Sequence, residues 1–165
     1  MYIWMMKKLL SFAVITLLIS CISCTENKSY YEQFNNDKPF FSRVLDLNKS
    51  FDNIRTQEKG KLIKEDVNFL KFAYQIGEND TYIVSYLFDE KGCYEIGVDG
   101  YFKFEKDALT VVNGIQKEME EAPYHKEADD NNLNRWKNTD KSISIELDHK
   151  DIDKGLFIAT IFANE

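Results

Sequence analysis

Alternation of apolar and polar residues dominates the middle of the chain, between residues 69 and 104. Apolar side chains recur at every second position in three runs, which the turn sequences at 77–80 and 89–92 separate. This period of two is typical of strands with one buried face. We predict an antiparallel meander whose apolar faces are Leu70, Phe72, Tyr74 and Ile76; Tyr82, Val84, Tyr86 and Phe88; and Tyr94, Ile96, Val98, Gly100, Phe102 and Phe104.

Two other stretches show the three- and four-residue spacing of a helix. Residues 105–122 carry one apolar stripe and are followed by Pro123, which ends a helix. Residues 40–58 carry a second stripe, Val44, Leu47, Phe51 and Ile54, with Asn48 or Ser50 as the helix cap. Because the other face of the meander is polar, we expect the long helix to cover the apolar face.

The rest of the chain predicts a polar loop and more strands. Residues 124–134 show no apolar period, Ile143, Ile145 and Leu147 alternate with polar residues, and residues 156–163 are apolar on both faces, as in a central strand. The predicted fold class is therefore α+β, an antiparallel sheet covered on one face by helix, in the order α-β-β-β-α-β-β-β.

The N-terminus has the pattern of a lipoprotein signal peptide. A basic pair, Lys7 and Lys8, precedes twelve uncharged and mostly apolar residues, a run shorter than the ~20 residues that span a bilayer. The following Leu-Ile-Ser-Cys sequence at 18–21 resembles the lipobox, so Cys21 is the expected lipid attachment site. Cys24 offers an alternative frame. We predict a signal peptide at 1–20, a lipid-anchored flexible tether at 21–39 and one α+β domain at 40–165.

The complete layout resembles the small uncharacterised lipoproteins common in Bacteroidetes. More loosely, it is similar to the domains of outer-membrane assembly lipoproteins and of β-lactamase-inhibitor-like proteins. The similarity covers roughly residues 40–165 and lies in the patterning of a short helix, a tyrosine-rich meander, a long helix and a Trp136-bearing hairpin. It implies a fold and a binding role, and it identifies no functional residue.

Charge narrows the classes of partner. The formal net charge is −7, and the basic residues are scattered among acidic ones. Binding to nucleic acid requires a basic face, and binding to anionic lipid headgroups requires a polybasic patch. We therefore expect no nucleic-acid partner, and membrane contact only through the N-terminal lipid.

The common catalytic and metal-binding patterns are incomplete. His125 and His149 both lie in polar stretches, and Asp130 begins a calcium-loop-like spacing that then lacks the required glycine and glutamate. Cys93 has no nearby Cys or His ligands, and we interpret it as a half-buried apolar residue, with a bridge to Cys24 or a redox role as alternatives. We expect no enzyme, no metal and no cofactor.

These observations favour a lipid-anchored binding module of the cell envelope, held at the outer membrane or facing the periplasm or cell surface, that engages another envelope protein. The alternatives are an immunity- or inhibitor-type lipoprotein that neutralises a periplasmic toxin or enzyme, and a small envelope hydrolase. The densest acidic region predicts a partner surface for a basic protein. Its candidate residues are Glu127, Asp129 and Asp130.

Overall fold

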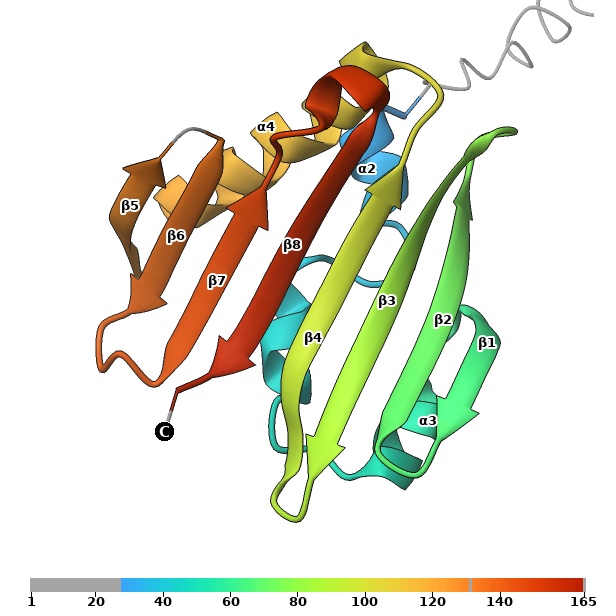
Figure 1. The fold of residues 1–165 in the computed structure, drawn as a ribbon, viewed down its shortest axis with the longest axis vertical. Helices are drawn as coiled ribbons and strands as arrows, with labels where there is room; N and C mark the ends of the chain where they lie inside the picture. Colours follow the sequence, from blue (N-terminus) through green and yellow to red (C-terminus); the bar gives the residue numbers. More distant parts are fainter. Residues whose placement is uncertain (1–27, 131, 165) are drawn as a thin grey trace, which may run out of the picture.

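Eight antiparallel strands form a single sheet, with the helices gathered on one of its faces (Figure 1). The computed structural model describes residues 28–130 and 132–164. Along the chain the elements are α2 (Tyr30–Phe34), η1 (Phe41–Asp46), α3 (Phe51–Gln57), β1 (Lys61–Asp66), β2 (Phe69–Ile76), β3 (Asp80–Asp89), β4 (Gly92–Tyr101), α4 (Glu105–Glu121), β5 (Tyr124–Asp130), β6 (Leu133–Asn138), β7 (Ile143–Asp148), η2 (Ile152–Lys154) and β8 (Leu156–Ala163).

The sheet consists of two consecutive four-stranded meanders joined side by side. The strand order is β1-β2-β3-β4-β8-β7-β6-β5, so the last strand of the chain pairs with β4 and closes the seam between the meanders. The mixed α+β class and the central position of residues 156–163 agree with the prediction. The predicted order is wrong, because each meander contains one strand more than expected.

Both unexpected strands, β1 and β5, lie at the edges of the sheet. Every residue of β1 is exposed, and β5 is a run of mostly polar residues that we expected to form a loop. An edge strand such as β1, with both faces in water, needs no alternating pattern, because the backbone hydrogen bonds of its one neighbour hold it in place. Among the described side chains of β5 only Tyr124 and Ala128 are partly buried, which is too few apolar positions to show a period. The sequence therefore carried no period-two signal for either strand.

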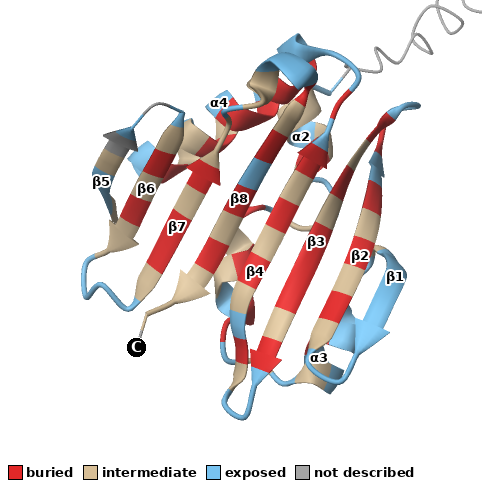
Figure 2. Ribbon diagram, in the orientation of Figure 1, coloured by how far each residue is buried: buried red, intermediate tan, exposed pale blue. Residues whose placement is uncertain are grey.

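Burial alternates along the inner strands as predicted, and Figure 2 shows buried positions alternating with intermediate ones. One exception is in β4, where the register shifts between Leu87 and Phe88 of its partner strand. The irregularity places Cys93 in the core and leaves Tyr94 37% exposed, so the prediction for Tyr94 is wrong. Phe104, which precedes α4, is also exposed (51%) rather than buried.

The long helix covers a different half of the sheet from the one we expected. α4 contacts β8, β5 and η2, and Gln116 on α4 donates a hydrogen bond to Asn134 on β6 (2.6 Å). The first meander is covered instead by α2, η1 and α3, where Phe34 packs on Tyr82 and Phe51 on Phe88, with ring centroids 4.7 and 5.1 Å apart. α4 cannot also pack on the apolar face of the first meander, because the N-terminal segment already covers that face.

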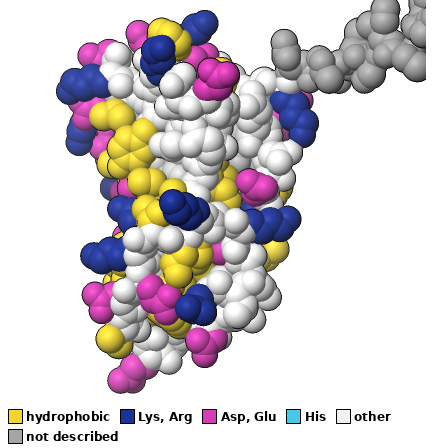
Figure 3. All heavy atoms as spheres, turned by 90° about the vertical axis from the view of Figure 1, so that its right-hand side faces the viewer, with side chains coloured by type: hydrophobic (Ala, Val, Ile, Leu, Met, Phe, Trp, Pro, Cys, Tyr) yellow, Lys and Arg dark blue, Asp and Glu magenta, His cyan; other side chains and the backbone are white. Residues whose placement is uncertain are grey.

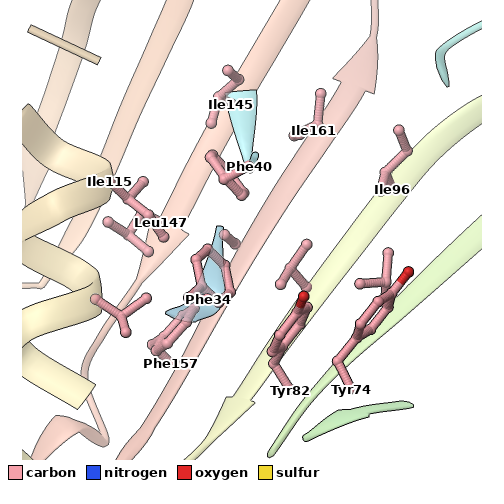
Figure 4. Close-up of a cluster of buried hydrophobic side chains, with 14 of the residues drawn as sticks. Phe34, Phe40, Tyr74, Tyr82, Ile96, Ile115, Ile145, Leu147, Phe157 and Ile161 are labelled. Atoms are coloured by element: carbon pink, nitrogen blue, oxygen red, sulfur yellow. The ribbon is translucent and has the colours of Figure 1, made fainter. Parts of the chain in front are cut away.

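That N-terminal segment was expected to be flexible tether as far as residue 39, and this boundary is wrong. Phe34 is 2% exposed and lies among Phe40, Phe157 and Tyr82 in the core (Figure 4). Tyr31 packs on α4 at Gly114, where a Cβ atom would lie 2.3 Å from the tyrosine ring, and its hydroxyl donates to Glu118. The folded domain therefore begins at about residue 29, with Ser29 capping α2.

The β1 edge of the sheet carries features that discourage pairing with another chain. Figure 3, which faces this side, shows hydrophobic side chains interspersed with Lys, Arg, Asp and Glu. Leu62 and Ile63 are exposed, but β1 also contains Lys61 and Lys64 and a register shift between Leu62 and Lys64. Lysines and bulges are common means of protecting a sheet edge.

Candidate functional site

The strongest electrostatic perturbations occur in a buried polar network between η1, the end of α3 and the first meander. Arg43 on η1 is 1% exposed, and its Nη1 donates to the Glu58 carboxylate (2.6 Å) and to Tyr86 Oη (2.8 Å). The hydroxyls of Tyr74 and Tyr86 both donate to Glu58. The meander thus supplies two phenols from its apolar face, and the helical layer supplies the ion pair.

A second acid extends this network towards solvent. Asp46, at the end of η1, is fully buried and accepts hydrogen bonds from Lys38, from Lys49 (2.9 Å) and from Tyr86 Oη (3.2 Å). A cleft of about 310 Å³ opens beside it. Lys38 and Lys49 on the cleft wall both pair with Asp46, and Lys38 also lies 3.4 Å from Glu58, so both lysines are held by the acids of the network.

The network holds its groups in one charge state over the neutral pH range. Burial alone would raise the pKa of Glu58, but the Arg43 charge and the two phenol hydrogen bonds outweigh it and lower the pKa to about 2. Burial and the hydrogen bond to Glu58 raise the pKa of Tyr74 to about 12, and burial raises that of Tyr86 further. General acid–base catalysis works best with a pKa near the operating pH. At neutral pH the network therefore contains a buried ion pair and two neutral phenols, which join η1 and the end of α3 to the first meander.

The second candidate site is the face of the sheet opposite the helices, which no described element covers (Figure 1). Cross-strand pairing places its side chains in rows that run across the strands. Two rows of larger residues, Ile83–Asp99–Ile158 and Leu87–Glu95–Phe162, enclose a row of small ones, Ser85–Gly97–Thr160. Each large row sets one carboxylate on β4 between apolar side chains on β3 and β8.

The centre of this open face is formed by fully paired strands and is partly apolar. Every strand that contributes to the three rows is paired on both sides, and Ile158 on β8 is 48% exposed. The basic residues of this face lie farther out, with Lys71 on β2 and Arg135 on β6. The surface can therefore bury apolar side chains of a partner and offer carboxylates to basic ones, which is the chemistry of a protein interface.

A larger hollow, of about 800 Å³, lies at the opposite end of the domain from α2. Its walls come from η1, from the start of β4 and from the β7 and β8 ends, and they include Leu45, which is 73% exposed, and Tyr94. The lining mixes apolar side chains with polar and charged ones, which are Asn48, Asp89, Lys91, Ser142 and Asn164.

The predicted acidic surface lies on the edge strand β5, far along the sheet from the open-face rows. Glu127 forms an ion pair with Lys137 of β6 (3.0 Å), and Asp130 is exposed at the end of the strand. Asp129 belongs to the same strand. The structure thus groups these residues along one edge and partly neutralises Glu127, but it does not bring them near Asp99.

The other residues singled out from the sequence lie apart from one another. His125 is exposed on β5, while His149 Nε2 lies 3.3 Å from Asn134 Oδ1. Cys93 is a free thiol that is fully rather than half buried, and burial raises its pKa to about 12. Cys21 and Cys24 lie outside the described residues. Within residues 28–130 and 132–164, no group of three or more His, Cys, Asp and Glu side chains is placed to hold a metal ion.

Sequence reasoning missed both the buried network and the open-face rows. Arg43 gave no signal, because a lone arginine in a short helical piece normally points to solvent. The rows had a weak signal, since Ile83, Leu87 and Ile158 are apolar at positions where a half-buried strand would be polar.

Comparisons of the chain with protein-family models, with curated proteins and with solved structures found no match. None of the helices in the described part of the chain is both long enough and apolar enough to cross a bilayer.

Proposed function

We propose that the chain is a lipid-anchored binding module of the cell envelope, which engages another envelope protein through the open face of its sheet. The observation that carries this proposal is the pair of apolar rows on β3, β4 and β8, each with a carboxylate at its centre and with no covering element among the described residues. Ile158 is exposed and Ile83, Leu87 and Phe162 are partly exposed, and an uncovered, partly apolar surface on a small domain supports a role in binding.

Charge and anchoring support the same function. The complete chain carries a net charge of −7, and an acidic protein attracts basic surfaces and speeds their encounter, particularly at low ionic strength. The lipid expected on Cys21 would keep the domain at a membrane surface, where its partners are also concentrated.

Photo-crosslinking in living cells tests this proposal. A photoreactive amino acid replaces Thr160, at the centre of the open face, or Lys117, a 75% exposed residue on α4 on the other side of the domain. We expect a discrete adduct with an envelope protein from position 160 and none from position 117. Identification of the adduct by mass spectrometry distinguishes a resident envelope partner from an incoming toxin or enzyme.

Equal labelling from both positions, or adducts from position 117 alone, would contradict the use of the open face. Absence of radiolabelled fatty acid on the mature chain would contradict the anchor. The two parts of the proposal can therefore fail separately.

A further inference from the structure

A small pocket opens on the open face where β4, β8 and the segment after β7 meet. Its volume is about 130 Å³, and its lining includes Asp99, Tyr101, Asp148, Asp151, Leu156 and Ile158. Cavities of roughly 150 Å³ hold one benzene-sized group, so this pocket takes one side chain and is too small for a nucleotide or another large cofactor. Tyr101, Leu156 and Ile158 make its walls largely apolar.

One carboxylate in this pocket has no partner. Asp148 pairs with Lys150 (3.2 Å), and Asp151 pairs with Lys154 (2.6 Å). Asp99 has no hydrogen bond or ion pair within the described part of the chain. Its nearest cross-strand neighbours are Ile83 and Ile158. A half-buried carboxylate between two isoleucines is unfavourable in the free protein, because it loses water and gains nothing in exchange.

The charged groups around Asp99 do not remove this cost. Burial raises the pKa of Asp99, and the Lys71 charge, on β2, opposes that rise only in part. Lys150 lines the same pocket, but Asp148 already holds it. An ionised Asp99 therefore lowers the stability of the folded protein above its ordinary titration range, where the raised pKa makes the charge costly. A group that costs stability on an exposed surface suggests a role in binding.

We propose that this pocket receives a lysine or arginine side chain of the protein partner, with its cation on Asp99 and its aliphatic stem against Tyr101, Leu156 and Ile158. The size of the pocket matches one long side chain, and the apolar walls match the methylene stem that such residues bury. The unpaired carboxylate matches the cationic head. A neutral apolar anchor would leave Asp99 buried and unpaired, which costs more than leaving it half in water.

This inference rests on the proposed function for its partner, but the pocket can be tested without one. The full-length chain, purified in detergent and labelled with ¹⁵N, is titrated with n-butylguanidinium, which mimics the end of an arginine side chain. The control probe is n-butylurea, which has nearly the same shape and no charge. We expect saturable shifts of the Gly100, Tyr101 and Ile158 amides with the cation, and binding at least about tenfold weaker with the urea.

Matched variants locate the charge that is responsible. Asp99→Asn should weaken n-butylguanidinium binding about tenfold, while Asp148→Asn, which changes a carboxylate already paired with Lys150, should change it less than about twofold. Unchanged amide shifts elsewhere in the spectrum show that both variants fold.

Equal binding of the two probes, no saturable binding, or an equal effect of the two variants would overturn the assignment. If the cation binds but no adduct forms at Thr160 in cells, the pocket stands and the proposed function fails. If the adduct forms but the cation does not bind, the open face remains the interface and the basic anchor is wrong.

Discussion

Replacement of Glu58 by glutamine should destabilise the domain in a way that depends strongly on pH. Glu58 balances the charge of Arg43, which is 1% exposed, and it also accepts the hydrogen bonds of Tyr74 and Tyr86. Each unit of pKa is worth about 1.36 kcal/mol. A pKa lowered from 4.5 to about 2 therefore corresponds to about 3 kcal/mol of folding stability at neutral pH.

The sign of the pH effect follows from the direction of this change. Because folding lowers the pKa of Glu58, its contribution is complete above the unfolded value of 4.5 and is lost as the pH falls towards about 2. Urea unfolding followed by circular dichroism, at several pH values from 7 down to 3, measures it. Glu58→Gln should be less stable than the unmodified chain by about 3 kcal/mol at pH 7, and the difference should shrink steadily below pH 4.5.

The matched control is Glu65→Gln. Glu65 also pairs with an arginine, Arg55 (2.9 Å), but the two side chains are 38% and 48% exposed, so the loss should be below about 1 kcal/mol. A similar loss in both variants, or a Glu58→Gln effect that does not change with pH, would show that the buried Arg43–Glu58 ion pair does not stabilise the fold as proposed.

Phe34→Ala should lower the free energy of unfolding by about 3–5 kcal/mol in urea unfolding, because its side chain is buried in the core. A decrease below about 1 kcal/mol would show that α2 is not part of the folded core. Cys21→Ser should abolish fatty-acid labelling and membrane retention while Cys24→Ser preserves both, and the reverse result would move the lipidation site to Cys24. Reversing the charge of the β5 acids should slow association with the crosslinked partner, measured by stopped-flow at low salt, without abolishing the adduct; these acids are Glu127, Asp129 and Asp130. An unchanged association rate would show that this edge is not part of the interface.

The parts of the fold that sequence could predict are those where one face is buried and the other is not. The apolar rows of β2 and β3 and the stripe of α4 obey this condition, and their burial follows the predicted period. The edge strand β1 does not obey it, and β5 has, among its described side chains, only Tyr124 and Ala128 in partly buried positions, so the pairing of both depends mainly on backbone hydrogen bonds that any sequence can make. Within the cover of the meander, η1 and α3 fall in the predicted helical stretch 40–58, with Ser50 as the N-cap of α3, whereas α2 was missed because it has only five residues and follows a polar stretch.

The candidate site could not be predicted, because it depends on contacts between residues far apart in the sequence. Arg43 meets Tyr86 only after η1 packs under β3, and Asp99 loses its water only because β3 and β8 flank β4 with isoleucines. Neither arrangement has a spacing that a local pattern could show. The prediction of an acidic partner surface was based on local charge density alone, and it pointed to residues that lie along one edge of the sheet.

Docking of a partner on the open face should be blocked by a single bulky substitution at the centre of that face. Gly97 lies in the middle row, where an added Cβ atom would meet only Ser85 Cβ, at 3.9 Å, so Gly97→Arg should fold normally. The photoreactive residue is placed at position 71 on β2, two strands away. We predict that Gly97→Arg abolishes the envelope-protein adduct formed from position 71 while leaving the melting temperature unchanged. An undiminished adduct in the folded variant would contradict docking on this face.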